Sequence, residues 1–299
     1  MTASATIERV SEPLGAATRP ALSQRTLAWR QFRRHRLALA GAATFLALCL
    51  TAVLAPVSPY DPNRTSLLDR FEPPSLTHPM GTDDLGRDEL TRVLIGGRIS
   101  LAVGMMAMMV SIVVGTLVGA LAGYFGRAVD SLLMRLTEMF IAFPQLFILI
   151  LLASLFGTGF WTIVLVVGLL RWMPVARLVR AAFLQLKEQE FVTAARALGA
   201  PTAAIMWRHI LPNALSPIIV AATLGVAGAI LTESTLSFLG LGIQLPTATW
   251  GNMLRAAQND MTTAPWLAFF PGFFIFLTIL SSNYIGDGLR DALDPHKQF

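Results

Sequence analysis

The chain has 299 residues, of which 54% are hydrophobic and only 14% charged, and its mean hydropathy is +0.60. Soluble domains carry about a quarter charged residues, so this composition argues against a soluble domain and indicates a membrane protein. The net charge of +5 is no nucleic-acid signature, because the basic residues cluster near the ends of apolar runs, where orientation signals lie. One cysteine, Cys49, excludes an internal disulfide, and four isolated histidines predict no metal site.

The first 36 residues form a polar tail with seven arginines and two glutamates. Residues 37–57 then run for 21 positions without a charge, which spans about 31 Å at 1.5 Å per residue, or one hydrocarbon core. A cleaved signal peptide has an apolar region of only about 7–15 residues. We therefore interpret this run as a signal-anchor helix whose arginine-rich tail stays in the cytoplasm.

Five more apolar stretches follow, near residues 99–123, 131–156, 160–182, 213–239 and 266–286. Together the six stretches predict an all-α integral membrane protein with six transmembrane helices and both termini in the cytoplasm. The positive-inside rule agrees, because the outer segment carries five basic and seven acidic side chains and the inner segment before the fifth helix carries five and two.

This topology divides the chain into five parts. They are a cytoplasmic tail 1–36, the first helix 37–57, an extracytoplasmic segment 58–98, a five-helix core 99–286 with a cytoplasmic hairpin 185–212 and an outer loop 240–265, and a cytoplasmic C-terminus 287–299.

Four small residues recur every four positions in the second stretch: Ser111, Gly115, Gly119 and Gly123. Such a stripe on one helix face lets another helix approach closely. The sequence leaves two alternatives open for it, a subunit interface and ordinary packing within the chain.

Three charged residues within apolar stretches are candidates for a translocation path: Glu138, Arg171 and Glu233. Charges at depth in a membrane are costly and usually face a cavity or a partner. Glu138 is three residues from Arg135, so a local ion pair is the simpler explanation, and a cross-helix pair with Arg171 is the alternative. Glu233 lies near the outer end of the fifth helix, where it either lines the path or reaches interfacial water.

Enzyme motifs are missing from the sequence. Neither lysine, Lys187 or Lys297, follows a glycine, so the chain has no P-loop, and it has neither a Gly-x-Ser-x-Gly elbow nor a His-Glu-x-x-His helix. We therefore expect a transport protein without catalytic residues of its own. A secondary transporter is one alternative, which would normally show an internal repeat and paired broken helices, and we find no convincing repeat.

The segment 193–212, TAARALGAPTAAIMWRHILP, lies between two apolar stretches and indicates two short helices with a hinge. Gly199 suits a left-handed position at the end of the first helix, and Pro201 suits the first turn of the second. Ala194 and Ala195 predict a surface without protruding side chains, against which a partner could press. Pro212 marks the start of the fifth crossing.

This segment resembles the loop of binding-protein-dependent ABC importer permeases that begins Glu-Ala-Ala, continues to a glycine and ends in Leu-Pro. The matching residues are Thr193-Ala194-Ala195, Gly199 and Leu211-Pro212. Thr193 replaces the usual acidic residue, which removes any salt bridge from that position, and His209 replaces an isoleucine. The coupling residues that the resemblance implies are Thr193, Ala194, Ala195, Gly199, Ala200, Pro201, Leu211 and Pro212.

Two further stretches, HPMGTDDLGRDELTRVLIGGRISL at 78–101 and ESTLSFLGLGIQLPTATWGNML at 233–254, are similar to the C-type permease of dipeptide, oligopeptide and nickel importers. The resemblance implies a type I ABC importer permease fold in the bacterial inner membrane. It also implies uptake of di- or oligopeptides, with nickel or another small solute as the alternative.

The partners that the resemblance implies are a homologous B-type permease, two ABC ATPase subunits or one fused ATPase, an extracytoplasmic substrate-binding protein and the lipid bilayer. ATP and Mg²⁺ would bind the ATPase subunits, and this chain would bind no cofactor. The outer segments would dock the binding protein or the sister permease, or form a lid packed on the bundle. The candidate docking residues are Gly81, Thr82, Asp83, Gly86, Arg87, Asp88 and Trp250.

Overall fold

The computed structural model describes residues 24–57 and 60–294, so 1–23 of the predicted tail and 295–299 of the predicted C-terminus lie outside it. Its helices are α1 (Gln24–Arg34), α2 (Arg36–Leu54), α3 (Glu89–Phe125), α4 (Arg127–Ala142), α5 (Gln145–Phe156), α6 (Phe160–Leu169), α7 (Trp172–Leu186), α8 (Glu190–Ala197), α9 (Thr202–Ala204), α10 (Leu211–Phe238), α11 (Trp250–Ala257) and α12 (Trp266–Leu293). Two 3₁₀ turns, η1 (Ala55–Val57) and η2 (Leu67–Asp69), and a π-helical turn, η3 (Ile205–Ile210), complete the described elements.

Four helical segments are long and apolar enough to cross a membrane: α2, α3, α12 and the continuous segment Thr202–Phe238, which joins α9, η3 and α10. Two bent pairs, α4 with α5 and α6 with α7, pass the same test as pairs and bend by 87° and 43°. Counting each pair as one span gives the six spans that the sequence predicts. The third and fourth predicted helices are therefore each two helices, and neither break was predicted from the sequence.

Prolines account for the two breaks. Phe143 precedes Pro144 and takes an extended conformation with φ −83° and ψ 138°, as a residue before proline prefers, so α4 ends there. In the other pair, the ring of Pro174 excludes the carbonyl of Leu170 four residues earlier from the helical ladder. The chain accordingly leaves the helix between α6 and α7.

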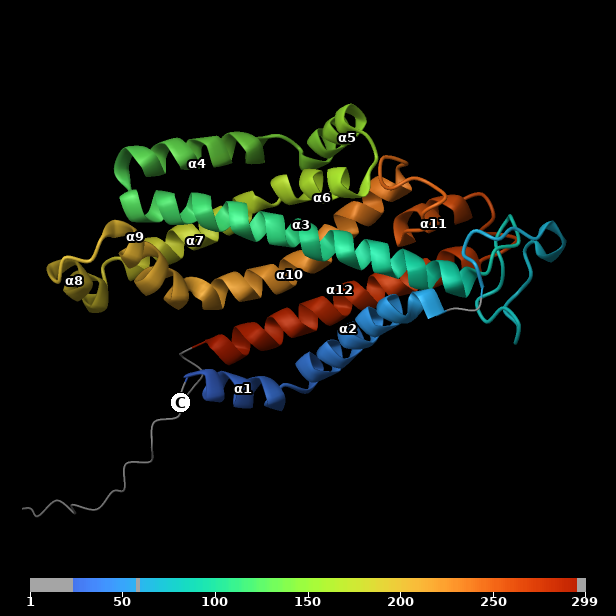
Figure 1. Ribbon diagram of the computed structural model, residues 1–299, viewed down its shortest axis with the longest axis horizontal. Coiled ribbons are helices and arrows are strands. Elements are labelled where there is room, and N and C mark those ends of the chain that lie inside the picture. The colour runs from blue at the N-terminus through green and yellow to red at the C-terminus, as the bar shows by residue number, and fades with distance from the viewer. Residues whose placement is uncertain (1–23, 58–59, 295–299) are drawn as a thin grey trace, which may run out of the picture.

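Helix α3 runs through the middle of the bundle and contacts α7, α10 and α6, while α12 packs on α2 and α10 (Figure 1). The hairpin α8–α9, helix α1 and the last turns of α12 lie at one end of the bundle. The segment 60–88 and α11 lie at the opposite end. The two ends of the bundle thus carry the inner and outer segments that the sequence assigns to opposite sides.

The small-residue stripe of α3 packs within the chain, against α6 and α7. A Cβ on Gly115 would lie 2.7 Å from the carbonyl oxygen of Trp172, and one on Gly119 would lie 2.4 Å from that of Ala176. The Ser111 hydroxyl donates to the carbonyl of Gly168 at 2.8 Å. Of the two alternatives for the stripe, the structure therefore selects packing within the chain, because α6 covers Ser111 and α7 covers the three glycines.

Candidate functional site

The hairpin between α7 and α10 reverses direction at Gly199. Its N–H donates to the carbonyl of Arg196, and the N–H of Ala200 donates to the carbonyl of Ala195, both at 3.0 Å. These two bonds form the Schellman motif that ends α8. Gly199 has φ +78°, which confirms its predicted left-handed conformation, and a Cβ at this position would meet no atom within 4 Å.

The two alanines of the hairpin face opposite ways. Ala194 is exposed together with Thr193 and Leu198, whose side chain is 88% exposed. Ala195 is buried on the same helix face as Val192, three residues earlier. The prediction that both alanines form a docking surface is thus wrong for Ala195, because the period of α8 turns that residue toward the bundle.

Beyond the Schellman motif the chain reaches α10 through the π-helical turn η3. Ala200 is half-buried, and Pro201 is exposed and caps the short helix α9. The N–H of Leu211 donates to the carbonyl of Met206, five residues back. Pro212 follows at the start of α10 and has no N–H to continue an α-helical ladder. The turn η3 was not predicted from the sequence, where Pro212 was the available signal for it. Such π-helical turns are frequent at functional sites.

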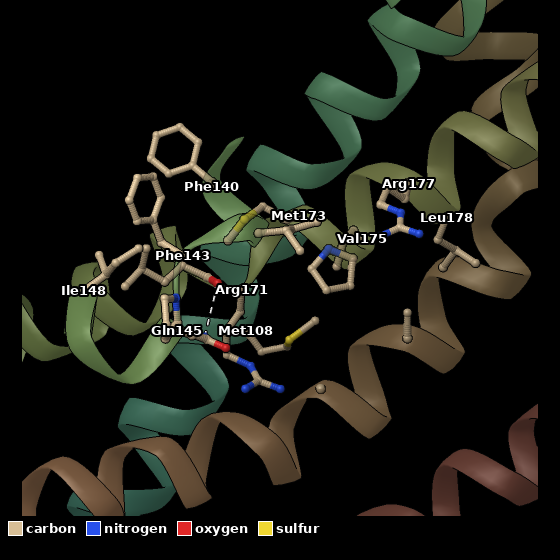
Figure 2. Close-up of a pocket in the computed structure, with 16 residues that line it drawn as sticks. Met108, Phe140, Phe143, Gln145, Ile148, Arg171, Met173, Val175, Arg177 and Leu178 are labelled. Atoms are coloured by element: carbon tan, nitrogen blue, oxygen red, sulfur yellow. Dashed lines mark hydrogen bonds between the residues drawn. The ribbon is translucent and has the colours of Figure 1, made fainter. Parts of the chain in front are cut away.

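The two helix breaks meet at a cavity of about 810 Å³ (Figure 2). The side-chain amide of Gln145, at the start of α5, donates to the carbonyl of Leu170 at 3.3 Å. This is the carbonyl that Pro174 excludes from the helical hydrogen bonds. Met108 and Gly225 also line the cavity, from near the middle of α3 and α10. The cavity therefore lies at mid-length of the bundle, between its two ends.

Arg171, at the break between α6 and α7, lines this cavity (Figure 2). Its Nη1 donates to the hydroxyl of Thr232 on α10 at 3.3 Å. A Cβ on Gly228 would lie 2.1 Å from its Nη2, so any larger residue there would push the guanidinium out of this position. The sequence indicated Arg171 from its charge, and the structure adds the neighbours that hold it in place.

Two ion pairs were predicted for Glu138, one with Arg135 and one with Arg171. Neither is among the ion pairs of residues 24–57 and 60–294. Glu138 is exposed on α4. The ion pair that links α4 to α7 instead joins Asp130 and Arg180, with Nη2 2.6 Å from Oδ2. Arg180 belongs to none of the motifs quoted from the sequence, so no sequence signal pointed to this partner.

Glu233 is fully buried in the outer half of α10. Its carboxylate accepts hydrogen bonds from Ser237 at 2.7 Å and from Ser234 at 3.4 Å. It does not line the cavity of about 810 Å³. In this conformation the carboxylate does not reach interfacial water, because α3, α10 and α11 meet around it.

The seven residues predicted for outer docking are all buried: Gly81, Thr82, Asp83, Gly86, Arg87, Asp88 and Trp250. Asp83 accepts from Nε of Arg87 at 2.6 Å, and Asp88 caps α3 by accepting from the N–H of Thr91 at 2.8 Å. The indole N–H of Trp250 donates to the carbonyl of Val93 at 2.9 Å. The two carboxylates are thus engaged within the outer segment and at the start of α3, and Trp250 joins α11 to α3. This arrangement matches the lid alternative rather than a docking face.

Comparisons with known proteins agree over nearly the whole chain. Residues 115–298 match the family described as binding-protein-dependent transport system inner membrane component, and residues 23–74 match the N-terminal TM domain of oligopeptide transport permease C. The chain is 45% identical over 279 residues to the dipeptide transport system permease protein DppC of Bacillus subtilis (strain 168), covering 93% of this chain and 87% of that protein.

Two oligopeptide transport system permease proteins OppC are similarly close. The one of Bacillus subtilis (strain 168) is 42% identical over 266 residues, which cover 89% of this chain and 87% of that protein. The one of Haemophilus influenzae is 43% identical over 272 residues, which cover 89% and 86%. The chain therefore belongs to the family of binding-protein-dependent transport system inner membrane components.

Proposed function

We propose that this chain is one of two permease subunits of an ABC importer that takes up di- or oligopeptides across the bacterial cytoplasmic membrane. The names of its relatives, dipeptide and oligopeptide transport permeases, support the substrate class. The observation that carries the mechanism is the hairpin α8–α9, which exposes Leu198 and Ala194 at one end of the bundle. Because the sequence has no P-loop, the energy for transport comes from ATP and Mg²⁺ on separate subunits, and this hairpin is the contact to them.

The other subunits complete the pathway. A homologous B-type permease packs on the exposed apolar face of α4 and α5, which includes Met139, Phe147 and Leu151. Two ATPase subunits, or one fused ATPase, bind at the hairpin end, and an extracytoplasmic binding protein delivers the peptide at the opposite end. Reporter fusions at residues 75 and 255 are then expected to report the outside and a fusion at 200 the cytoplasm. A cytoplasmic signal at 75 would reverse this orientation.

The coupling surface consists of the outward residues of the hairpin. Thr193, Ala194 and Leu198 contact the ATPase, and Gly199 with Ala200 and Pro201 sets the reversal that presents them. Leu211 and Pro212 join this contact to α10 through η3. Small exposed side chains on α8 let the ATPase come close to the backbone, and the missing carboxylate at Thr193 does not affect that contact.

The peptide passes the cavity at the two helix breaks, where Arg171 presents its charge, and Glu138 is exposed on α4 about one turn before the break that follows Ala142. Glu233 joins this path when α11 moves away from α10, since its carboxylate is buried while the two remain packed. Docking of the binding protein uses exposed residues of the outer segment rather than the seven buried ones. Leu68 and Leu76 are 96% and 103% exposed there.

The coupling proposal is tested by Ala194→Glu and Gly199→Val in a chain purified with its neighbouring subunits. Ala194→Glu places a charge on the exposed face, and Gly199→Val forces a branched side chain into a left-handed conformation that costs about 1–2 kcal/mol. We expect loss of ATPase co-purification or of peptide-stimulated ATP hydrolysis in both variants. The matched control is Thr262→Glu, which adds the same charge at an exposed position of the opposite end.

Ala195→Glu is unsuitable for this test, because it would bury a charge within the hairpin. If Ala194→Glu and Gly199→Val bind the ATPases and transport at the control's level, the hairpin is not the coupling element. If the unaltered chain co-purifies with no ATPase and takes up solute alone, driven by an ion gradient, the importer proposal itself fails.

A further inference from the structure

The cavity at the two helix breaks has the size of a small-molecule site and carries positive charge only. Its volume of about 810 Å³ lies within the range of about 300–1,000 Å³ that such sites occupy. Among its lining residues Arg171 and Arg177 are charged, and no Asp or Glu lines it. The remaining lining side chains are mostly apolar, including Met108, Phe140 and Ile148.

In the part of the chain that the structure describes, Arg171 has no carboxylate partner, because none of the ion pairs found there includes Arg171. The hydrogen bond to Thr232 engages Nη1, and the guanidinium carries five N–H donors in all. A half-buried cation at mid-length of a membrane bundle is costly unless an anion or a cavity faces it. The open donors of Arg171 are therefore available to an anion inside the cavity.

The neighbours of Arg171 fix its position. Gly228 leaves room for the guanidinium against the backbone of α10. The hydroxyl of Thr232 donates to the carbonyl of Gly228 at 2.8 Å, and this leaves its oxygen to accept from Arg171. Figure 2 shows the guanidinium next to α10, below the helix breaks. A cation held in this way can bind a carboxylate with two parallel N–H···O bonds.

We propose that Arg171 binds the C-terminal carboxylate of a peptide in transit, with the peptide's side chains in the apolar part of the cavity. The inference rests on the proposed function in peptide uptake. Every unmodified linear peptide carries this carboxylate whatever its side chains, so one arginine serves substrates of many sequences. The apolar walls, by contrast, offer no specific partner for side chains, which suits a permease that passes varied peptides.

The test compares uptake of trialanine and trialanine amide by the complete transporter reconstituted in liposomes, with the chain unaltered or carrying Arg171→Gln, Arg171→Lys or Arg135→Gln. The binding protein is identical in all four, so its own preference for the free acid cancels when the uptake ratios of the two peptides are compared. We expect Arg171→Gln to lower the ratio of free acid to amide about tenfold, the effect of one charge-assisted hydrogen bond.

Arg171→Lys keeps the charge and is expected to retain most of the preference for the free acid. Arg135→Gln removes an exposed charge of α4 outside the cavity lining and is expected to leave the ratio unchanged. The proposal is overturned if Arg171→Gln slows both peptides equally, which would mean that Arg171 holds the fold or pairs with a carboxylate of the sister permease.

Liposomes with and without phosphatidylglycerol separate a peptide carboxylate from a lipid phosphate. If the effect of Arg171→Gln on the ratio appears only with the anionic lipid, the guanidinium binds a headgroup and the proposal is overturned. A wild-type complex that binds its ATPases but transports neither peptide would instead refute the proposed peptide substrate. These outcomes distinguish failure of the Arg171 site from failure of the proposed function.

Discussion

Replacing Gly119 with alanine tests how closely α3 and α7 approach. The added Cβ would lie 2.4 Å from the carbonyl oxygen of Ala176, 2.8 Å from Cβ of Val179 and 3.0 Å from the backbone nitrogen of Arg180. Ordinary contact begins at 3.4 Å, so the nearest atom is about 1 Å too close. All three atoms belong to the backbone or to a branched Cβ, and none can rotate away.

Two opposing effects decide how much Gly119→Ala changes the free energy of unfolding. Alanine is a better helix former than glycine by about 1 kcal/mol, whereas overpacking a close contact costs about 1–3 kcal/mol. Because the contact here is with rigid atoms, we expect the upper part of that range and a net loss of about 1–2 kcal/mol in the free energy of unfolding. The helices would otherwise have to separate along the whole stripe of α3.

The assay is the unfolding midpoint of the full chain in detergent micelles, followed by size-exclusion chromatography after heating. Gly272→Ala is the matched control, since this α12 glycine has only Cδ2 of Leu254 within reach, at 3.8 Å. The control should leave stability unchanged or raise it by up to about 1 kcal/mol. If Gly119→Ala is as stable as the control, α7 does not press on this stripe and the packing we describe is wrong.

Three further variants test other contacts. Glu233→Gln keeps an acceptor for Ser237 but loses the charge, so peptide uptake should fall about fivefold while the yield of assembled complex stays constant; unchanged uptake would remove Glu233 from the path. Trp250→Phe removes the indole N–H that donates to the carbonyl of Val93, which keeps its helical donor, and should cost about 0.5–1.5 kcal/mol in the free energy of unfolding; a neutral result would contradict that bond. Asp130→Asn breaks a partly exposed ion pair with Arg180 and should lower the free energy of unfolding by less than about 1 kcal/mol in the same assay. A loss above about 2 kcal/mol would show that this pair stabilises the fold more than a surface ion pair does.

Much of the architecture follows from the apolar runs and from single residues with strict backbone demands. Each run is long enough for one crossing, and this gives six spans whether or not a helix breaks within the membrane. Gly199 was predictable because few residues other than glycine adopt φ near +78° without strain. These features depend on local sequence, which is present in full before any tertiary contact forms.

The geometry of the candidate site could not be predicted from the sequence, because it depends on contacts between residues far apart in the chain. Pro144 and Pro174 were visible in the sequence, but proline can also kink a membrane helix without ending it. The neighbours of Arg171, Gly228 and Thr232, lie on a helix far along the chain. Ala195 was misplaced because two adjacent alanines carry no sign of which one faces the bundle.

The paired helix breaks also bear on classification. We gave broken helices as a mark of secondary transporters, and the chain has two of them although it belongs to an importer family with a separate binding protein. Breaks in a membrane helix supply polar backbone and room for a charged side chain, which any solute pathway needs. They therefore indicate a pathway rather than a particular energy source.

The continuous segment Thr202–Phe238 has a mechanical consequence. Its 37 residues make a rod of about 55 Å that begins in the hairpin and ends beside the outer lid. Its two weak points, η3 and Pro217, both lie in the half nearest the hairpin, while the half that carries Gly228 and Glu233 has an unbroken hydrogen-bond ladder. We therefore expect bending imposed at the hairpin to concentrate at these two points, and the outer half to follow a displacement along the rod axis as one rigid helix.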